Sequence, residues 1–289
     1  MRRLEFLANQ VRKSTDNTDT NGISNEELQG YYNDAQKYIQ ALIFKSNPDA
    51  DFFKAESVQA FNGTNTYVLP DDCYSQNSIY SVELQYNTSG INDGYTRIKR
   101  IQQSERTQTF GYFVVNNQVV ISGEAEQSNY QNIRITYFRN LKTLGFRQQK
   151  VQSVVAGVSI TLVSIPEFLY NVDDHISTVD AEGAQVVSDI YFTNTSGSVL
   201  STTATAGVNN TQWVVSGKNG TNKCELPEAC EVYLQDYVRQ RIYTRNNYED
   251  ANKQLYFTEQ QKLDIVSLFS KNKKDDDLNP ITDVDFLTW

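Results

Sequence analysis

The stretch "ISNEELQGYYNDAQKYIQALIF", residues 23–44, begins as a strongly specified helix. Ser24 is a favoured N-cap residue, and Glu27 stands at the capping-box spacing three positions later. Pro48 ends the helix, which we therefore predict from residue 25 to about residue 46. Its apolar residues recur every three or four positions and predict one buried stripe: Leu28, Tyr31, Tyr32, Ala35, Ile39, Leu42 and Ile43.

A polar spacer, "STDNTDTNG" at 14–22, precedes this helix. Before the spacer, four apolar residues at helical spacing predict a shorter amphipathic helix: Leu4, Leu7, Ala8 and Val11. We expect the shorter helix to pack against the longer one as a helical hairpin.

The period changes to two after the helices, which is typical of strands. Residues 80–86 place Tyr80, Val82, Leu84 and Tyr86 on one predicted face, and 133–138 do the same with Ile133, Ile135 and Tyr137. Between them, "GYFVVNNQVVIS" at 111–122 indicates a hairpin whose Asn116-Asn117 turn tolerates positive φ. The sequence therefore predicts a small antiparallel sheet.

Residues 146–224 differ in composition, with only 4 Lys or Arg and 6 Asp or Glu among 79 residues. Short bursts of Val, Ile and Thr alternate there with turns of Gly, Asn and Ser. This pattern is typical of a small sandwich or barrel, and we predict an all-β, sandwich-like module.

Helical patterns return near the end of the chain. Residues 227–246 align Cys230, Leu234, Val238 and Ile242, with Pro227 suited to the first turn, and 247–271 place Ala251, Leu255, Leu263 and Val266 inside. Both ends of the chain thus read as helical hairpins, and the simplest packing joins them in one core.

We therefore predict an α+β fold, in which a bundle of N- and C-terminal helical hairpins carries a small antiparallel sheet and an inserted β-module. The predicted parts are 1–145 with 225–272 as the core, 146–224 as the insertion, and 273–289 as an extended arm.

The arm contains Pro280, has no helical stripe and ends in aromatic residues. One reading is a solvated, frayed tail. The other is a docking arm for a neighbouring chain, because an exposed Trp lowers solubility unless a partner covers it. The candidate docking residues are Leu278, Pro280, Val284, Phe286, Leu287 and Trp289.

Composition and net charge limit the classes of function that the sequence allows. Charged residues are 21%, hydrophobic residues 39% and aromatic residues 12%, as expected of a folded protein. The formal net charge of −9 argues against a surface that grips nucleic acid. No apolar run is long enough to span a membrane, and three cysteines without C-x-x-C spacing favour reduced thiols. We expect a protein that is assembled in the cytoplasm and has no membrane partner.

Signals for chemistry are weak. His175 is the only histidine, and the sequence contains no phosphate-binding or dinucleotide-binding glycine motif. The acidic pairs Asp71-Asp72 and Asp173-Asp174 are more typical of turns than of metal or acid–base sites. We therefore expect no enzyme activity, and we assign no catalytic, cofactor-binding or metal-binding residue.

The order of elements resembles that of a known family. A short helix, a polar spacer and an S-x-E-E-L helix are followed by "YVLPDDCYSQNSIYSVEL", "GYFVVNNQVVIS", "IRITYFRNL" and "LPEACEVYLQDYVRQRIYTRNNYEDANKQLYFTEQQKL". In this order the chain resembles the head-to-tail adaptor proteins of tailed bacteriophages, including the ring proteins of crAss-like phages. The likeness covers about residues 1–145 and 225–270.

The resemblance implies a structural virion protein at the head-to-tail junction. Family members form closed rings, usually dodecamers, beneath the portal protein, contact the next tail ring or nozzle protein, and leave a channel through which genomic DNA passes without specific binding. The three long helices, at 25–45, 227–246 and 248–270, would build the ring wall. The 146–224 insertion would contact a tail fibre or another tail protein, and the arm would reach the portal or a neighbouring copy.

Two other functions stay open. Some adaptors have been credited with peptidoglycan hydrolysis, which needs two carboxylates flanking a cleft. Alternatively, the β-module binds glycans, with Trp213 or Tyr191 as a stacking platform, although both residues are more often found in a core.

Overall fold

The structure is a computed structural model of an α+β protein. It describes residues 2–16, 22–47, 51–61, 65–86, 94–107, 109–123, 130–167, 175–202, 205–246 and 251–269. The chain divides into two compact units: Met1–Asp49 with Lys142–Trp289, and Ala50–Leu141. This division differs from the predicted one, because the β-module belongs with the helices while the predicted sheet forms a unit of its own.

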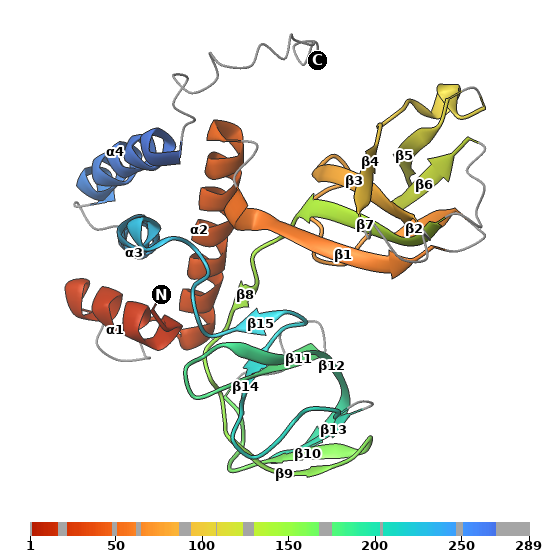
Figure 1. The fold of residues 1–289 in the computed structure, drawn as a ribbon. Helices are drawn as coiled ribbons and strands as arrows, with labels where there is room; N and C mark the ends of the chain where they lie inside the picture. Colours follow the sequence, from red (N-terminus) through yellow and green to blue (C-terminus); the bar gives the residue numbers. More distant parts are fainter. Residues whose placement is uncertain are drawn as a thin grey trace. The chain divides into compact units, whose positions relative to one another are not determined.

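The first unit contains the helices α1 (Leu4–Ser14), α2 (Asn25–Ser46), α3 (Glu231–Arg245) and α4 (Ala251–Phe269) (Figure 1). The backbone N–H of Glu27 donates to Ser24 Oγ at 3.1 Å, as predicted for the α2 N-cap. The Glu27 carboxylate accepts from Tyr31 Oη at 2.7 Å and pairs with Arg245 at 3.2 Å. It therefore links α2 to α3 instead of closing the predicted capping box.

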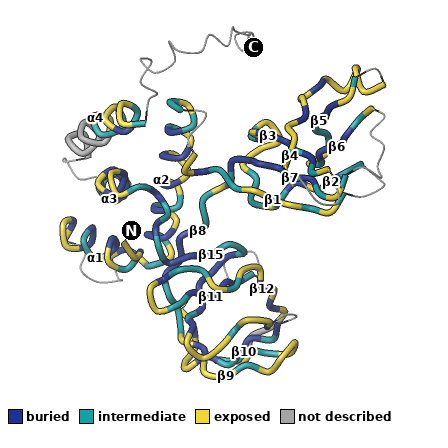
Figure 2. The backbone as a smooth tube through the Cα atoms, in the orientation of Figure 1, coloured by how far each residue is buried: buried dark blue, intermediate teal, exposed yellow. Residues whose placement is uncertain are grey.

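Helix α2 buries two kinds of side chain. Its predicted apolar stripe is largely confirmed, because Leu28, Tyr32, Ala35, Ile39 and Ile43 are buried (Figure 2). The second set is polar and was not predicted: Gln29, Gln36 and Gln40 are at most 5% exposed. Buried amides need hydrogen-bond partners, and the partners of Gln29 and Gln36 determine how the β-module is attached.

Helix α3 lies between α1 and α4 and also contacts α2 (Figure 1). All four apolar residues predicted to face inward from α3 are fully buried: Cys230, Leu234, Val238 and Ile242. Pro227 precedes a short 3-10 turn, Glu228–Cys230, before α3 begins. The four apolar residues predicted to line one face of α1 are buried as well. Among the described residues, α1 packs on α3, and Arg12 of α1 also donates to Asn25 Oδ1 and Ile23 O at the start of α2.

Helix α4 is turned differently from the prediction. Leu263, predicted to be inside, is 61% exposed, and Ile265 is buried in its place at 2%. The Gln261 side chain donates to Asp236 Oδ2 of α3 at 2.5 Å, which holds α4 in this rotation. The side chains of Ala251 and Leu255 lie outside the described residues.

The second unit, Ala50–Leu141, is a pair of packed antiparallel sheets. One sheet has the order β1-β7-β3-β4 and the other β2-β6-β5, and their buried residues form one core. The elements are η1 (Asp51–Phe53), β1 (Lys54–Ala60), β2 (Thr66–Val68), β3 (Ile79–Tyr86), β4 (Tyr95–Ile98), η2 (Gln103–Glu105), β5 (Gly111–Val115), β6 (Gln118–Ser122) and β7 (Tyr130–Phe138).

The hairpin prediction is confirmed, because Asn116 and Asn117 connect β5 to β6 with φ of 49° and 60°. The predicted common face of β3 is only half correct. Val82 and Leu84 are buried, but Tyr80 is 37% and Tyr86 42% exposed. The pairing of β3 with β7 slips at both ends of β3, and each slip changes the face to which the terminal tyrosine points.

The 146–224 module is all-β as predicted, but it closes into a barrel instead of a two-sheet sandwich. Six strands follow the order β14-β11-β12-β13-β10-β9. The segment before β9 then pairs with β14: Val214 N–H donates to Gln149 O and Gln148 N–H to Val214 O, both at 2.9 Å. The strands are β9 (Val151–Val155), β10 (Ser159–Leu162), β11 (His175–Val179), β12 (Gln185–Ser196), β13 (Val199–Thr202) and β14 (Trp213–Ser216).

Strand β12 bends and so belongs to two sides of the barrel, which lets few strands close it. Its pairing with β11 slips near Asp189, which has a φ of 58°. Bulges of this kind bend a strand and let it turn a barrel corner. Eight buried apolar side chains fill the interior: Val151, Ile160, Leu162, Ile176, Ile190, Phe192, Leu200 and Val214.

The barrel joins the helices through two short parallel strands, β8 (Thr143–Leu144) and β15 (Gly220–Thr221). The backbone N–H groups of Thr143 and Gly145 donate toward the β15 side, to Asn219 O and Thr221 O. The opposite edge of β8 faces α2, where the side-chain amide of Asn33 makes the hydrogen bonds that a neighbouring strand would make. Its Nδ2 donates to Leu144 O at 2.9 Å and its Oδ1 accepts from Leu144 N–H at 2.7 Å.

Two buried glutamines of α2 continue this pairing. Gln36 Nε2 donates to Lys142 O at 2.7 Å, and Gln29 Oε1 accepts from Phe146 N–H at 3.1 Å. Three amide side chains on one helical face therefore satisfy the free edge of residues 142–146, which water would otherwise have to hydrate.

We predict that replacing Asn33 with Leu destabilises the helix–barrel unit by about 2 kcal/mol, because Leu fills the space but leaves both Leu144 backbone groups without partners. Urea unfolding measures the change. Asp34→Leu, at the exposed neighbouring position, is the control and should stay within about 0.5 kcal/mol of wild type. An Asn33→Leu protein as stable as wild type would contradict the assigned role.

Candidate functional site

The main candidate site lies where the first turn of α1 meets the barrel. Residues 2–4 pair with 222–224 in a short antiparallel bridge. Leu4 N–H donates to Asn222 O at 2.9 Å, and Cys224 N–H donates to Arg2 O at 3.2 Å. The bridge fixes the backbone from which Arg3 and Lys223 project.

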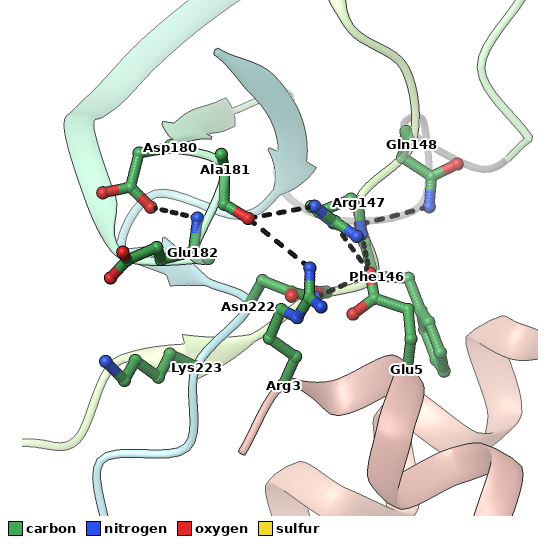
Figure 3. Close-up of polar contacts among 12 residues, drawn as sticks. Arg3, Glu5, Phe146, Arg147, Gln148, Asp180, Ala181, Glu182, Asn222 and Lys223 are labelled. Carbon is green, nitrogen blue, oxygen red and sulfur yellow. Dashed lines mark hydrogen bonds and ion pairs between the residues drawn. The ribbon is translucent and has the colours of Figure 1, made fainter. Parts of the chain in front are cut away.

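The Glu5 carboxylate clamps this junction (Figure 3). Its Oε1 accepts from Arg147 N–H at 3.1 Å, from Arg147 Nε at 3.3 Å and from Asn222 Nδ2 at 2.9 Å. The Asn222 amide also donates to Gly145 O at 2.9 Å, and Asn222 is fully buried. One carboxylate thus holds together α1 and both ends of the barrel segment.

A tight loop at 180–183 forms the opposite wall. Asp180 Oδ1 accepts from the backbone N–H groups of Glu182 and Ala184, each at 2.9 Å. Gly183 has a φ of +88°, and a Cβ there would lie 2.9 Å from Asn222 Oδ1, so only glycine fits. Arg3 and Arg147 each donate to Ala181 O at 3.4 Å (Figure 3).

Between these walls lies an open pocket of about 450 Å³, which is lined by Arg2, Arg3, Phe6, Ala181, Glu182 and Lys223. We call it the basic pocket. Phe6 is 47% exposed, and the Arg2 guanidinium lies over its ring at 5.0 Å from the ring centre. A hydrophobic ring beside cations provides contacts for an anion that carries an apolar group.

The charges of the basic pocket are unbalanced. Arg2 pairs with the buried Glu231 at 3.3 Å, and Glu5 is committed to Arg147. Within the described part of the chain, Arg3 and Lys223 pair with no carboxylate. Glu182 is the only acidic residue in the lining, so the pocket favours a negatively charged ligand.

A second, polar pocket of about 290 Å³ lies beside the clamp. Its lining includes Glu5, Asn25, Arg147, Gln148 and Glu167. Its polar groups bind one another, because Asn25 Nδ2 donates to Glu167 Oε2 and Glu167 N–H donates to Gln148 Oε1, both at 3.1 Å. This pocket is therefore part of the junction's internal hydrogen bonding.

The residues considered for chemistry do not converge. Asp71 and Asp72 form a turn, in which Asp72 accepts from Tyr137 Oη at 2.8 Å. His175 Nδ1 lies 2.8 Å from Asp189 Oδ1 on the barrel surface, while Asp173 and Asp174 lie outside the described residues. No group of three or more His, Cys, Asp or Glu in the described part of the chain could hold a metal ion.

Two further sets of residues were predicted from the sequence, those that would stack on glycans and those that would form the docking arm. Trp213 is half-buried, with Arg147 and Lys150 each 5.4 Å from its ring centre, so cations occupy its faces. Tyr191 is 40% exposed, and its ring centre lies 5.2 Å from that of His175. The six docking-arm residues from Leu278 to Trp289 lie outside the described residues.

The cysteines are unpaired, as predicted, and two of them are fully buried. Burial raises the thiol pKa of Cys224 from 9.0 to about 11 and that of Cys230 from 9.0 to about 12. Thiolates are the reactive form of cysteine, so neither residue acts as a nucleophile at neutral pH.

The residues of the basic pocket were not singled out from the sequence. Arg2 and Arg3 lie next to each other in "MRRLEF", but Lys223 and Glu182 are distant in the chain. Only the pairing of 2–4 with 222–224 brings them together. A charged pair at the start of an amphipathic helix was the only signal available.

No family model matches the chain, and no curated protein matches it significantly. Among the described residues, no helix is both long and apolar enough to cross a membrane.

We predict that Asn222→Ala lowers the free energy of unfolding by about 2 kcal/mol, because Gly145 O loses a donor in a buried site and Glu5 loses one of its donors. Thermal and urea unfolding measure the loss. Asn9→Ala, an exposed asparagine on α1, is the matched control and should change stability by less than about 0.5 kcal/mol. If the two substitutions had equal effects, the structural role assigned to Asn222 and Glu5 would be refuted.

Stability should fall in alkali because of the buried thiols. Unfolded thiols lose their protons near pH 9, whereas the folded thiols of Cys224 and Cys230 keep theirs up to about pH 11 and 12. The unfolded state therefore binds fewer protons above pH 9, and the free energy of unfolding decreases as pH rises.

Urea unfolding in reductant from pH 8 to 11 tests this expectation. Cys224→Ala and Cys230→Ala should each make the decrease above pH 9 shallower, by up to about 1 kcal/mol per pH unit. Asn9→Ala, which removes no thiol, is the control and should leave the slope unchanged. Parallel slopes for all three variants would contradict the expectation.

Proposed function

We propose that this chain is a structural virion protein, a head-to-tail adaptor that forms a ring beneath the portal and joins the capsid to the tail. The order of sequence elements supports this proposal, through its resemblance to the adaptor family. The observation that carries it furthest is the distribution of exposed apolar side chains on the helix–barrel unit.

Among the described residues of the helix–barrel unit, the large apolar side chains that are more than half exposed occur in two groups. On α3 and α4, Val232, Leu263 and Leu268 are 58%, 61% and 65% exposed. The second group lies at the two ends of β10 and has exposures from 53% to 66%: Val155, Val158, Val163 and Ile165. A closed ring needs a heterologous interface, in which one surface meets a different surface on the next copy. Two distinct apolar groups on one unit meet that requirement.

In this proposal the bundle of helices α1–α4 carries the sheets and the inserted barrel, and α2, α3 and α4 build the ring wall. The barrel contacts a tail fibre or another tail protein, and the ring lies between the portal and the next tail ring or nozzle protein. The net charge of −9 suits a channel through which DNA passes without being retained. The proposed role requires assembly surfaces and no catalytic group.

Glycan binding by the barrel is a second candidate, favoured by the exposed Tyr191 beside His175. Aromatic rings at a surface stack on apolar sugar faces. A Tyr191→Ala chain that keeps all binding to host surface glycans would remove this candidate.

Mass photometry tests the adaptor role. The full chain, mixed with the portal protein of the same genome, should add mass in a multiple of 33.0 kDa, up to about a dodecamer. We expect Leu268→Asp and Val158→Asp to weaken assembly at least about tenfold, because each removes an apolar contact from the subunit interface.

Val68→Asp provides the control, since Val68 is 58% exposed but belongs to the second unit. It should leave the ring intact. The proposal would be falsified by a chain that binds neither the portal nor itself and is missing from purified virions.

A further inference from the structure

We propose that the basic pocket binds the acidic segment 275–289 of a second copy of this chain. The inference deepens the proposed function and rests on it in one respect, because a ring places the copies side by side. The pocket and the segment are different surfaces, so their contact is heterologous, as a closed ring requires.

Charge complementarity is the first argument. Residues 275–289, "DDDLNPITDVDFLTW", contain five aspartates and no Lys or Arg. The pocket presents Arg2, Arg3 and Lys223 against the single carboxylate of Glu182. Of the other nearby carboxylates, Glu231 pairs with Arg2 and Glu5 with Arg147, and Asp180 accepts from two backbone N–H groups of its own turn. Arg3 and Lys223 therefore have charge available for an incoming carboxylate.

The second argument is the apolar content of both partners. The segment carries Phe286, Leu287 and Trp289 next to its aspartates. The pocket offers the Phe6 ring, which is 47% exposed and lies under the Arg2 guanidinium. An aromatic residue that joins this pair gains ring contact and a cation–π interaction. A simple anion would leave Phe6 uncovered.

The third argument is that the pocket is held in shape before any ligand arrives. The bridge between residues 2–4 and 222–224 fixes its floor, and the Asp180 turn fixes its wall. Arg3 donates to Ala181 O at 3.4 Å, which already holds its guanidinium against the pocket wall. Preorganised groups lose less entropy on binding, so even a short segment can bind usefully.

Nucleic acid fits the pocket less well. Three cations are few beside the six to ten phosphate contacts that are typical of strong DNA binding, and the chain as a whole repels phosphate. We therefore assign the pocket to an acidic protein segment and treat DNA as an outcome of the test.

Charge reversal on full-length chains tests the contact. One variant reverses the pocket, with Arg3→Glu and Lys223→Glu. The other reverses the segment, with Asp275→Lys, Asp276→Lys and Asp277→Lys. Association between differently labelled copies is measured by fluorescence cross-correlation at 50 mM and 500 mM salt.

Wild-type copies should associate, and more weakly at high salt, because partly exposed charges are screened. Each variant alone should associate at least about tenfold more weakly, since both of its surfaces then carry the same sign. Mixing the two variants should restore association to within about threefold of wild type, because opposite charges again meet in both directions. The acidic segment of the pocket variant meets a basic pocket, and the basic segment of the other variant meets the reversed, acidic pocket. Lys13→Glu is the matched control and should have little effect, because Lys13 is an exposed lysine on α1, the helix that follows Arg3.

Several results would overturn the inference. These are wild-type copies that do not associate, a mixture that stays as weak as its components, or a Lys13→Glu chain that is weakened equally. The segment variant leaves the pocket unaltered, so it tests the contact even if Arg3→Glu unfolds the junction. Stronger competition by a 20-base-pair DNA duplex than by the peptide 273–289 would assign the pocket to nucleic acid.

The same variants separate this inference from the proposed function. A wild-type chain that forms no ring with the portal defeats the adaptor proposal. If both charge-reversed variants still form wild-type rings on the portal, the adaptor role stands and the assignment of the pocket fails.

Discussion

The short strand β8 must have both of its edges hydrogen-bonded, and the rest of the helix–barrel unit follows from how this is achieved. Strand β15 satisfies one edge. In the described part of the chain the other edge meets no strand, and the amides of Gln29, Asn33 and Gln36 on α2 satisfy it. Because an unpaired backbone group in a buried site costs as much as a lost hydrogen bond, these amides determine where the barrel is attached.

The attachment explains why the insertion belongs with the helices. A module joined by two flexible linkers would move as a separate body, as inserted domains commonly do. Here the two chain ends of the barrel pair with each other, with α2 and, through Asn222 and Glu5, with the first turn of α1. Polar contacts of this kind accept only one geometry, so they specify the arrangement more strongly than apolar packing would. The pair of sheets in 50–141 has its own core.

The basic pocket is a product of the same junction. Its cations come from the start of α1 and from the strand end that leaves the barrel, and its wall comes from a glycine-dependent turn. Its chemistry is that of binding, because guanidinium and ammonium groups hold anions but supply no nucleophile or base at neutral pH. A binding pocket of this kind suits the proposed role in assembly.

The sequence alone determined the features that depend on local interactions. The N-cap at Ser24, the stripe of α2, the Asn116-Asn117 turn and the all-β character of 146–224 were all predicted, because capping, periodicity and turn chemistry act over a few residues. The tertiary structure decided the rest. Barrel closure, the rotation of α4 and the grouping of 50–141 depend on pairings between distant residues. The amide residues of α2 recur at helical spacing, but their role as hydrogen-bond partners follows only from the position of β8.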